Sequence, residues 1–283
     1  MKISNFVSVN GIKLSYIIEG SGIPCLVIGS AIYYPRTFSQ ELRQHFKFIF
    51  TDTRGFVPSD TPVDLEKITV DMFLDDAEQI RRALDIPKIC VLGHSIHGNL
   101  ALEYAHKYPQ HTSHVIVIGA PPCGMRKNLK ASRQYWKNNA SEERKEVLKR
   151  ISESQKIEAL SNLSPSEIVI KSYVNNSPIY WYDPTYDCSW IWEGVKVNAK
   201  IVGKLEGVLF KNYNIAKDQG LLDIPIFVAM GKHDYMVPHF QWDTEIENMP
   251  ILSYNLFEKS GHTPQLEEPS EFNKKLIDWI KSL

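Results

Sequence analysis

Val91-Leu92-Gly93-His94-Ser95-Ile96-His97-Gly98-Asn99-Leu100 joins a short apolar run to a helical pattern that begins directly behind it. A sharp strand-to-helix turn of this kind lifts the Ser95 hydroxyl above the edge of a sheet and directs the helix N-terminus at the same point. The stretch therefore predicts a nucleophile at Ser95. The alternative interpretation is that Ser95 only caps the helix, because serine is a favoured N-cap residue.

Two further loops carry the groups that a serine nucleophile requires. The apolar run 224–230 leads into Gly231-Lys232-His233-Asp234, and the run 251–257 leads into Ser260-Gly261-His262. Each loop follows the end of an expected strand, which is the edge where open α/β sheets bind ligands. The chain order Ser95, Asp234, His262 predicts a nucleophile, an orienting acid and a general base, and these are the candidate catalytic residues.

Short apolar runs alternate with helical patterns along most of the chain. Residues 3–9 and 12–18 meet at Asn10-Gly11, a strong signal for a β-hairpin. The later runs suit strands that are buried on both faces of a parallel sheet. They are 24–29, 46–51, 88–93, 114–118, 224–230 and 251–257. The pattern predicts an α/β fold with a mostly parallel, eight-stranded sheet, flanking helices and right-handed crossovers.

An insertion interrupts this alternation. We expect residues 1–121 and 221–283 to form the core and residues 122–220 to form an inserted helical lid. Ser164-Pro165-Ser166-Glu167 has the spacing of a capping box and predicts a helix start within the lid. A run of charges in the first half of the lid indicates a solvated helix face. Its members are Glu142, Glu143, Arg144, Lys145, Glu146, Lys149 and Arg150.

The second half of the lid is rich in aromatic residues. The six rings are Tyr180, Trp181, Tyr182, Tyr186, Trp190 and Trp192. They either line a substrate pocket or form the core of the lid, and the sequence leaves both interpretations open. On the first interpretation Trp181 and Trp190 are candidate substrate-binding residues.

Composition excludes several classes of protein. The chain of 283 residues has 32 Lys and Arg against 33 Asp and Glu, so its formal net charge of -1 creates no global attraction for nucleic acid or anionic membranes. Neither a bilayer-spanning run nor a signal peptide is evident, and we expect a cytoplasmic protein. The four cysteines and nine histidines show no paired metal-ligand spacing, so no metal is expected. The expected partner is a small-molecule substrate, and the protein is expected to be a monomer or homodimer.

Five segments carry a family pattern in their order along the chain. They are Val9-Asn10-Gly11-Ile12-Lys13-Leu14-Ser15-Tyr16, Asp52-Thr53-Arg54-Gly55 with Ser59-Asp60, the turn at Ser95, the Gly-x-x-Asp-x-x-Val-Pro loop of Asp234, and the Gly-His-x-Pro loop of His262. With these segments the chain resembles the α/β-hydrolase superfamily, and most of all its lidded prolyl aminopeptidase, esterase and haloperoxidase-type members. The resemblance implies the α/β-hydrolase fold and a Ser-Asp-His triad that requires no cofactor.

Two positions depart from the superfamily pattern. The G-x-S-x-G motif has glycine two residues after its nucleophile, where this chain has His97, with Gly98 one position later. We expect His97 to be structural, hydrogen-bonded and directed away from the substrate. The loop after the strand 24–29 keeps Gly29 but replaces the usual histidine by Ile28, and it lacks the His-Gly-Gly-Pro-Gly of prolyl aminopeptidases. By position, the backbone N–H groups of Ser30 and Ile96 form the expected oxyanion hole.

The sequence predicts a serine hydrolase that cleaves an ester, amide or lactone bond of a small, partly apolar molecule through an acyl-enzyme on Ser95. Three alternatives use the same fold or triad. They are a cofactor-free haloperoxidase, a C–C hydrolase or lyase, and a non-enzymatic receptor for a small ligand.

Overall fold

A β-hairpin opens the central sheet of the computed structural model, which describes residues 5–58, 64–155, 162–215, 223–249 and 251–283. Strands β1 (Asn5–Val9) and β2 (Ile12–Glu19) pair antiparallel around Asn10 and Gly11, whose φ angles are 50° and 80°. Positive φ at both turn residues suits the tight two-residue turn that Asn-Gly predicts. The hairpin is confirmed from residue 5 onward, because residues 1–4 lie outside the described residues.

Eight strands form one sheet in the order β1-β2-β4-β3-β5-β6-β7-β8. Strand β2 also pairs antiparallel with β4, and all the later pairs are parallel. The mostly parallel, eight-stranded α/β fold predicted from the sequence is therefore confirmed. The remaining strands are β3 (Ile23–Gly29), β4 (Phe46–Asp52), β5 (Ile89–His94), β6 (Thr112–Ile118), β7 (Ile226–Gly231) and β8 (Leu252–Phe257).

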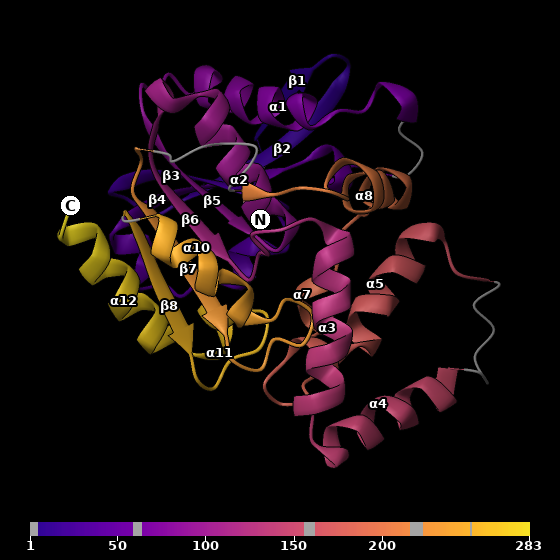
Figure 1. Ribbon diagram of the computed structural model, residues 1–283. Coiled ribbons are helices and arrows are strands. Elements are labelled where there is room, and N and C mark those ends of the chain that lie inside the picture. The colour runs from indigo at the N-terminus through magenta and orange to yellow at the C-terminus, as the bar shows by residue number, and fades with distance from the viewer. Residues whose placement is uncertain (1–4, 59–63, 156–161, 216–222, 250) are drawn as a thin grey trace.

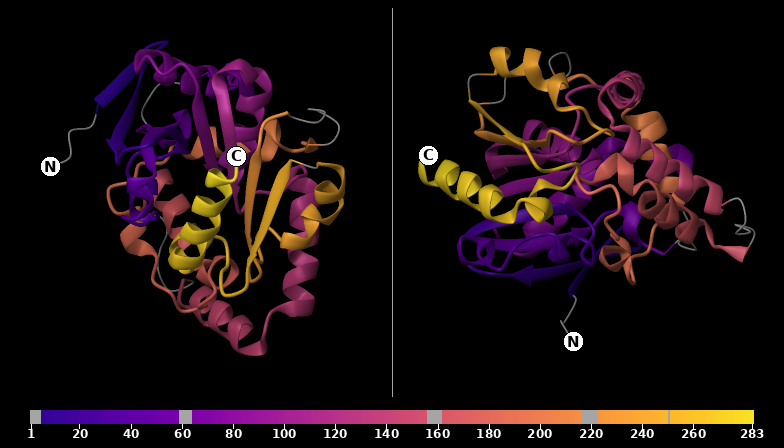
Figure 2. Two further views of the ribbon diagram at one scale, coloured as in Figure 1. Left: turned by 90° about the vertical axis from the view of Figure 1, so that its left-hand side faces the viewer. Right: turned by 90° about the horizontal axis from the view of Figure 1, so that it is seen from below.

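Helices cover both faces of the sheet (Figures 1 and 2). Alternate residues of β3 face opposite layers, with Leu26 and Ile28 in one buried cluster and Cys25 and Val27 in the other. The core helices are α1 (Val70–Ala83), α2 (Ile96–Lys107), α10 (Asp243–Asn248), α11 (Pro264–Glu267) and α12 (Pro269–Lys281). Side chains of α1, α2 and α10 pack in the first cluster, and those of α12 pack in the second.

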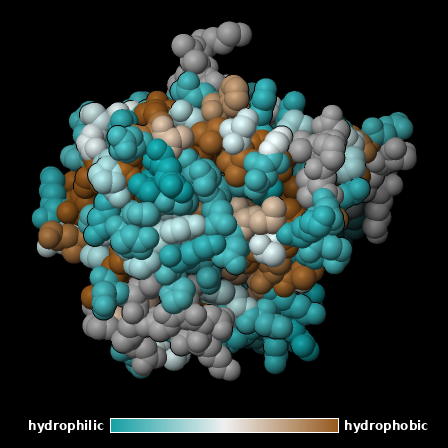
Figure 3. Space-filling view, turned by 90° about the horizontal axis from the view of Figure 1, so that it is seen from above, coloured by the Kyte–Doolittle hydropathy of each residue, from teal (hydrophilic) through white to brown (hydrophobic). Residues whose placement is uncertain are grey.

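Short helical turns occupy several loops of the core. These 3-10 turns are Tyr34–Arg36, Leu42–Gln44, Arg54–Phe56, Leu65–Lys67, Pro109–His111 and His239–Trp242. The face above α1 and β1 is mainly hydrophilic, with smaller hydrophobic patches (Figure 3). On this outer side Lys107 bridges Asp71 and Asp75 of α1.

The helices between β6 and β7, which we call the lid, project together from one end of the sheet (Figure 1). They are α3 (Met125–Asn139), α4 (Glu142–Gln155), α5 (Pro165–Asn175), α6 (Ser177–Tyr180), α7 (Ser189–Trp192), α8 (Ala199–Lys204) and a π-helical turn at Leu205–Leu209. Ser164 caps α5 through the predicted capping box with Glu167. The division into core and lid at 122–220 stays a prediction, and residue 220 lies outside the described residues, as do Ser59 and Asp60.

Candidate active site

Ser95 occupies the turn between β5 and α2 with φ of 56° and ψ of -134°. Only a tightly packed turn holds a serine in this sparsely populated region. Two glycines allow the packing. A Cβ on Gly93 would lie 1.9 Å from the carbonyl oxygen of His97, and a Cβ on Gly98 would lie 2.6 Å from the Cβ of Ala120. The backbone therefore presents the Ser95 side chain at the end of the strand.

The offset glycine explains the departure at His97. Gly98 is the residue at which α2 passes close to β6, since a side chain there would also meet Val117. The close contact that the superfamily places two residues after its nucleophile falls one residue later in this chain, so the position of His97 is free to carry a side chain.

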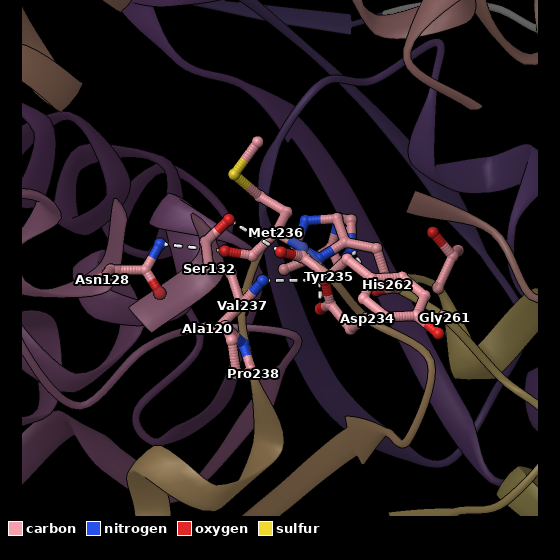
Figure 4. A network of polar contacts seen from close by, with 12 residues as sticks. Ala120, Asn128, Ser132, Asp234, Tyr235, Met236, Val237, Pro238, Gly261 and His262 are labelled. Carbon is pink, nitrogen blue, oxygen red and sulfur yellow. Dashed lines mark hydrogen bonds and ion pairs between the residues drawn. The ribbon is translucent and has the colours of Figure 1, made fainter. Parts of the chain in front are cut away.

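Asp234 and His262 meet at the ends of neighbouring strands. The His262 Nδ1 atom lies 2.6 Å from Oδ2 of Asp234, which is fully buried, while Oδ1 of Asp234 accepts the backbone N–H groups of Met236 and Val237 (Figure 4). Gly119 makes room for the imidazole, because a Cβ there would lie 3.2 Å from Nδ1. Since Nδ1 is engaged, Nε2 is the nitrogen that remains for chemistry.

The first lid helix supports the loop that carries Asp234. The Ser132 hydroxyl of α3 donates to the carbonyl of Tyr235 at 2.7 Å, and the Asn128 amide donates to the carbonyl of Met236 at 3.1 Å (Figure 4). Both side chains are buried. The lid is thus attached directly to the acid loop.

A cavity brings Ser95 and His262 together between the sheet and the lid. Both residues line it, with Ile96 and His97 beside them. Most of its wall is aromatic or aliphatic. The lining side chains from the lid include Tyr173, Tyr180, Trp181, Trp192, Val202 and Leu205.

The two candidate substrate-binding tryptophans lie in different places. Trp181 is 5% exposed and lines the cavity, and its contact with substrate stays a prediction. Trp190 is 39% exposed, donates its indole N–H to the hydroxyl of Tyr186, and is not among the described residues that line the cavity. This position gives no support for contact between Trp190 and substrate, which stays a prediction from the sequence. Its α7 helix has four residues, too few to establish a periodicity from which the direction of the ring could be inferred.

The two expected oxyanion donors also differ in position. Ile96 lines the cavity, whereas Ser30 is 1% exposed and is not among the described residues that line it. The Ser30 hydroxyl accepts the backbone N–H groups of Ile32 and Tyr33. Asp52 at the end of β4 accepts the N–H of Ala31 at 2.8 Å, so the loop after β3 is held from two sides.

His97 lines the cavity and shares a hydroxyl with His94. The Tyr34 hydroxyl lies 3.1 Å from His97 Nδ1 and 3.5 Å from His94 Nδ1. Burial lowers the pKa of His97 to about 4, so its imidazole is neutral at pH 7. The expected hydrogen bond is present, and the structural role of His97 stays a prediction. The expectation that His97 points away from the substrate edge is wrong, because its side chain lines the cavity and Gly98 takes the inner position against β6.

Two groups at the cavity, Tyr34 and Glu206, were not singled out from the sequence. Tyr34 follows a glycine-containing loop, and Glu206 lies in the π-helical turn. The Tyr173 hydroxyl donates to Glu206 at 3.1 Å, and burial raises the pKa of this carboxyl group. A π-helical turn is itself a frequent mark of functional sites, but it has no sequence signature from which it could be predicted.

The described residues offer no group of three or more His, Cys, Asp or Glu side chains placed to bind a metal. The four cysteines are buried and free. Within the described ranges, none of the helices combines the length and the apolar character that crossing a membrane requires.

The sequence model of the α/β-hydrolase fold matches residues 23–269. The chain belongs to this family. It is 32% identical over 272 residues to the AB hydrolase superfamily protein YclE of Bacillus subtilis (strain 168), with 96% of each chain covered. It is also 24% identical over the full length of both chains to a proline iminopeptidase of Heyndrickxia coagulans. Among solved structures, an α/β fold family hydrolase from Bacillus anthracis str. Sterne superimposes with a TM-score of 0.73 at 23% identity, covering 98% of this chain and 99% of that one.

These findings confirm the resemblance predicted from the five ordered segments. The hydrolase belongs to a superfamily whose members differ in their chemistry, so the reaction has to be argued from its own cavity.

Proposed function

We propose that this α/β hydrolase is a serine hydrolase that cleaves an ester, amide or lactone bond of a small, partly apolar molecule. One observation carries the proposal: Ser95 at a positive-φ turn shares a cavity with His262, whose Nδ1 lies 2.6 Å from the buried carboxylate of Asp234. A hydroxyl, an imidazole and a buried carboxylate in this relation supply a nucleophile, a general base and an orienting acid.

The reaction begins when Ser95 Oγ attacks the substrate carbonyl carbon and His262 Nε2 takes the hydroxyl proton. The oxyanion of the tetrahedral intermediate accepts hydrogen bonds from the backbone N–H groups of Ile96 and Ser30. The position of Ile96 in the cavity lining supports the first donor, and the position of Ser30 directly after β3 supports the second. The bond to the leaving group breaks as the imidazolium returns its proton to that group. Water then attacks the acyl-enzyme with His262 again as base, and Ser95 is regenerated.

The cavity wall supports an apolar substrate. Trp181 and Val202 come from the lid, and Phe56 comes from the core, so a bound acyl chain is enclosed from both sides. Apolar walls with few polar groups are typical of small-molecule sites.

A second candidate, an aminopeptidase-type activity, is favoured by Glu206. This carboxylate lies in a largely apolar wall, where an ammonium group of the substrate would compensate its burial. The similarity to a proline iminopeptidase supports the same candidate, although the His-Gly-Gly-Pro-Gly segment is missing here. The Glu206→Gln variant separates the two. It should raise KM for amino-acid anilides at least tenfold and leave KM for acetate esters unchanged if an ammonium binds there.

Turnover of short-chain aryl esters tests the proposal. Wild-type protein should release the aryl alcohol continuously, and Ser95→Ala should lose this activity by several orders of magnitude while remaining folded. Equal turnover by both proteins would contradict it, and binding of esters without turnover would favour the receptor.

A cytoplasmic location and a monomeric or homodimeric state remain predictions from the sequence.

A further inference from the structure

Residues 178–182 of the lid, which we call the strap, line the cavity in part and contact the loops that carry Asp234 and His262. The side chains of Tyr180 and Trp181 line the cavity. The Tyr180 ring lies 5.4 Å from the His262 ring. The strap is therefore the part of the lid that lies next to the proposed base.

The backbone of the strap is hydrogen-bonded to each loop. The N–H of His262 donates to the carbonyl of Tyr180 at 2.5 Å, and the N–H of Tyr235, next to Asp234, donates to the carbonyl of Ile179 at 3.1 Å. The contact with the histidine loop is close enough to require glycine, because a Cβ on Gly261 would lie 2.1 Å from the Tyr180 oxygen. A shift of the strap would therefore displace both the proposed base and the loop of its acid partner.

Glu267 adds a second connection between the strap and the histidine loop. Its carboxylate accepts the N–H of Tyr182 at 2.7 Å and the N–H groups of Gly261 and Thr263, each at 3.0 Å. Gly261 and Thr263 flank His262 on either side. One carboxylate thus holds the end of the strap and both neighbours of the imidazole.

Arg144 of α4 holds the strap from the opposite side. Its guanidinium donates to the carbonyls of Pro178 and Trp181 at 2.7 Å each, and to the carbonyl of Tyr182 at 2.5 Å. The guanidinium also lies 5.1 Å from the centre of the Tyr235 ring. The planar guanidinium has several donors in fixed directions and can donate to three carbonyls at once. A lysine ammonium is a compact charge on a flexible stem and suits this arrangement less well.

Arg144 lies among charged residues that face solvent, yet it is only 6% exposed. Figure 1 shows α4 at the outer edge of the lid, so this side chain connects the outer lid with the strap. A buried guanidinium costs free energy unless its donors are satisfied. Here three carbonyls of the strap accept hydrogen bonds from the guanidinium and offset the free-energy cost of its burial. The strap is also the segment that contacts His262.

We propose that Arg144 is a positioning residue for the hydrolytic reaction: by holding the strap, it sets the orientation of His262 and Asp234 relative to Ser95. This inference rests on the proposed serine-hydrolase function. Arg144 itself does not line the cavity, so its effect on the reaction passes through the hydrogen bonds of the strap.

The test compares Arg144→Met and Arg144→Lys with Arg150→Met, which removes an exposed arginine from the same helix. Four quantities are measured well below the melting temperature of each variant: kcat and KM for an aryl ester, the rate at which a small fluorophosphonate labels Ser95, and the low-field proton NMR signal of the His262–Asp234 hydrogen bond. The fluorophosphonate is small, so its reaction depends on activation of Ser95 more than on contacts with the lid.

Arg144→Met should lower kcat and the labelling rate tenfold to about a hundredfold, the range expected when reacting groups are misplaced by about 1 Å. KM should change less than kcat, and the low-field proton signal should shift or broaden. Arg144→Lys should recover part of the loss, and Arg150→Met should match the wild type. If Arg144→Met does not fold, the Arg144→Lys comparison carries the test with the same expected direction.

The inference is overturned if folded Arg144 variants keep the wild-type kcat, labelling rate and proton signal, even when their melting temperatures fall. That result would leave Arg144 with a structural role alone and would not affect the proposed function. The proposed function is contradicted by a different result, namely no labelling of Ser95 in the wild-type protein. The proton signal reports the position of His262 in either case.

Discussion

His262 and Asp234 lie 28 residues apart in the chain, and their side chains meet at 2.6 Å with Asp234 fully buried. The carboxylate has a second task, because its other oxygen accepts the N–H groups of Met236 and Val237. The hydrogen bonds within its own loop thus hold the Asp234 carboxylate independently of its contact with the His262 imidazole. An acid fixed in this way can hold one tautomer and orientation of the base.

Asp234→Asn should lower kcat by about four orders of magnitude with little change in KM, because an amide that donates to Nδ1 favours the wrong imidazole tautomer. Ester turnover measures the effect, and circular dichroism checks the fold. A loss of less than tenfold would show that another group orients His262.

Trp181 and Trp190 form a matched pair, since one is buried at the cavity and the other is half-exposed outside it. Trp181→Phe should change KM severalfold for esters with bulky acyl groups, and Trp190→Phe should leave the preference for acyl groups as in the wild type. A ladder of acyl chain lengths provides the measurement. An unchanged preference in Trp181→Phe would assign this ring to the core of the lid.

His97→Gly restores the superfamily pattern and removes an imidazole from the cavity wall. We expect kcat for short esters to stay within a few fold of the wild type and larger acyl groups to be accepted better. The Tyr34 hydroxyl keeps His94 as a neighbour at 3.5 Å. A hundredfold loss of kcat in the folded variant would make His97 a participant in the chemistry.

The buried His97 also predicts a pH dependence of stability. Its pKa falls from the ordinary 6.5 to about 4 on burial, so between these values the unfolded chain binds a proton that the folded protein excludes. Its contribution to stability is complete above about pH 6.5 and is lost as the pH falls toward 4. Urea titrations should show the free energy of unfolding falling by about 1–3 kcal/mol more in the wild type than in His97→Gly over this range. Parallel pH profiles of the two proteins would contradict the assignment.

The sheet and the placement of Ser95, Asp234 and His262 at strand ends were predictable because their signals are local. Asn10-Gly11 predicts a hairpin, and the strand runs are short and apolar. Ser95 directly follows β5, and Asp234 and His262 lie in the loops that follow β7 and β8. The topology of a parallel sheet then brings strand ends to one edge.

The lid was less predictable because its contacts are between segments without periodicity. Arg144 stands in a charged run that is typical of a solvated face, and its burial depends on carbonyls 34 to 38 residues later. Trp181 and Trp190 are equally large rings in one aromatic segment, and only the folded lid separates them. The direction of the His97 side chain was predicted wrongly, because the sequence pattern does not reveal that α2 passes closest to β6 at Gly98.

The most direct test of the account is mass spectrometry of the protein after a fluorophosphonate or a slowly hydrolysed ester has reacted. The account predicts one adduct per chain, located on the peptide that contains Ser95, absent from Ser95→Ala and strongly slowed in His262→Ala. An adduct on another residue, or equal labelling of Ser95→Ala, would contradict the proposal that Ser95 is the nucleophile of this hydrolase.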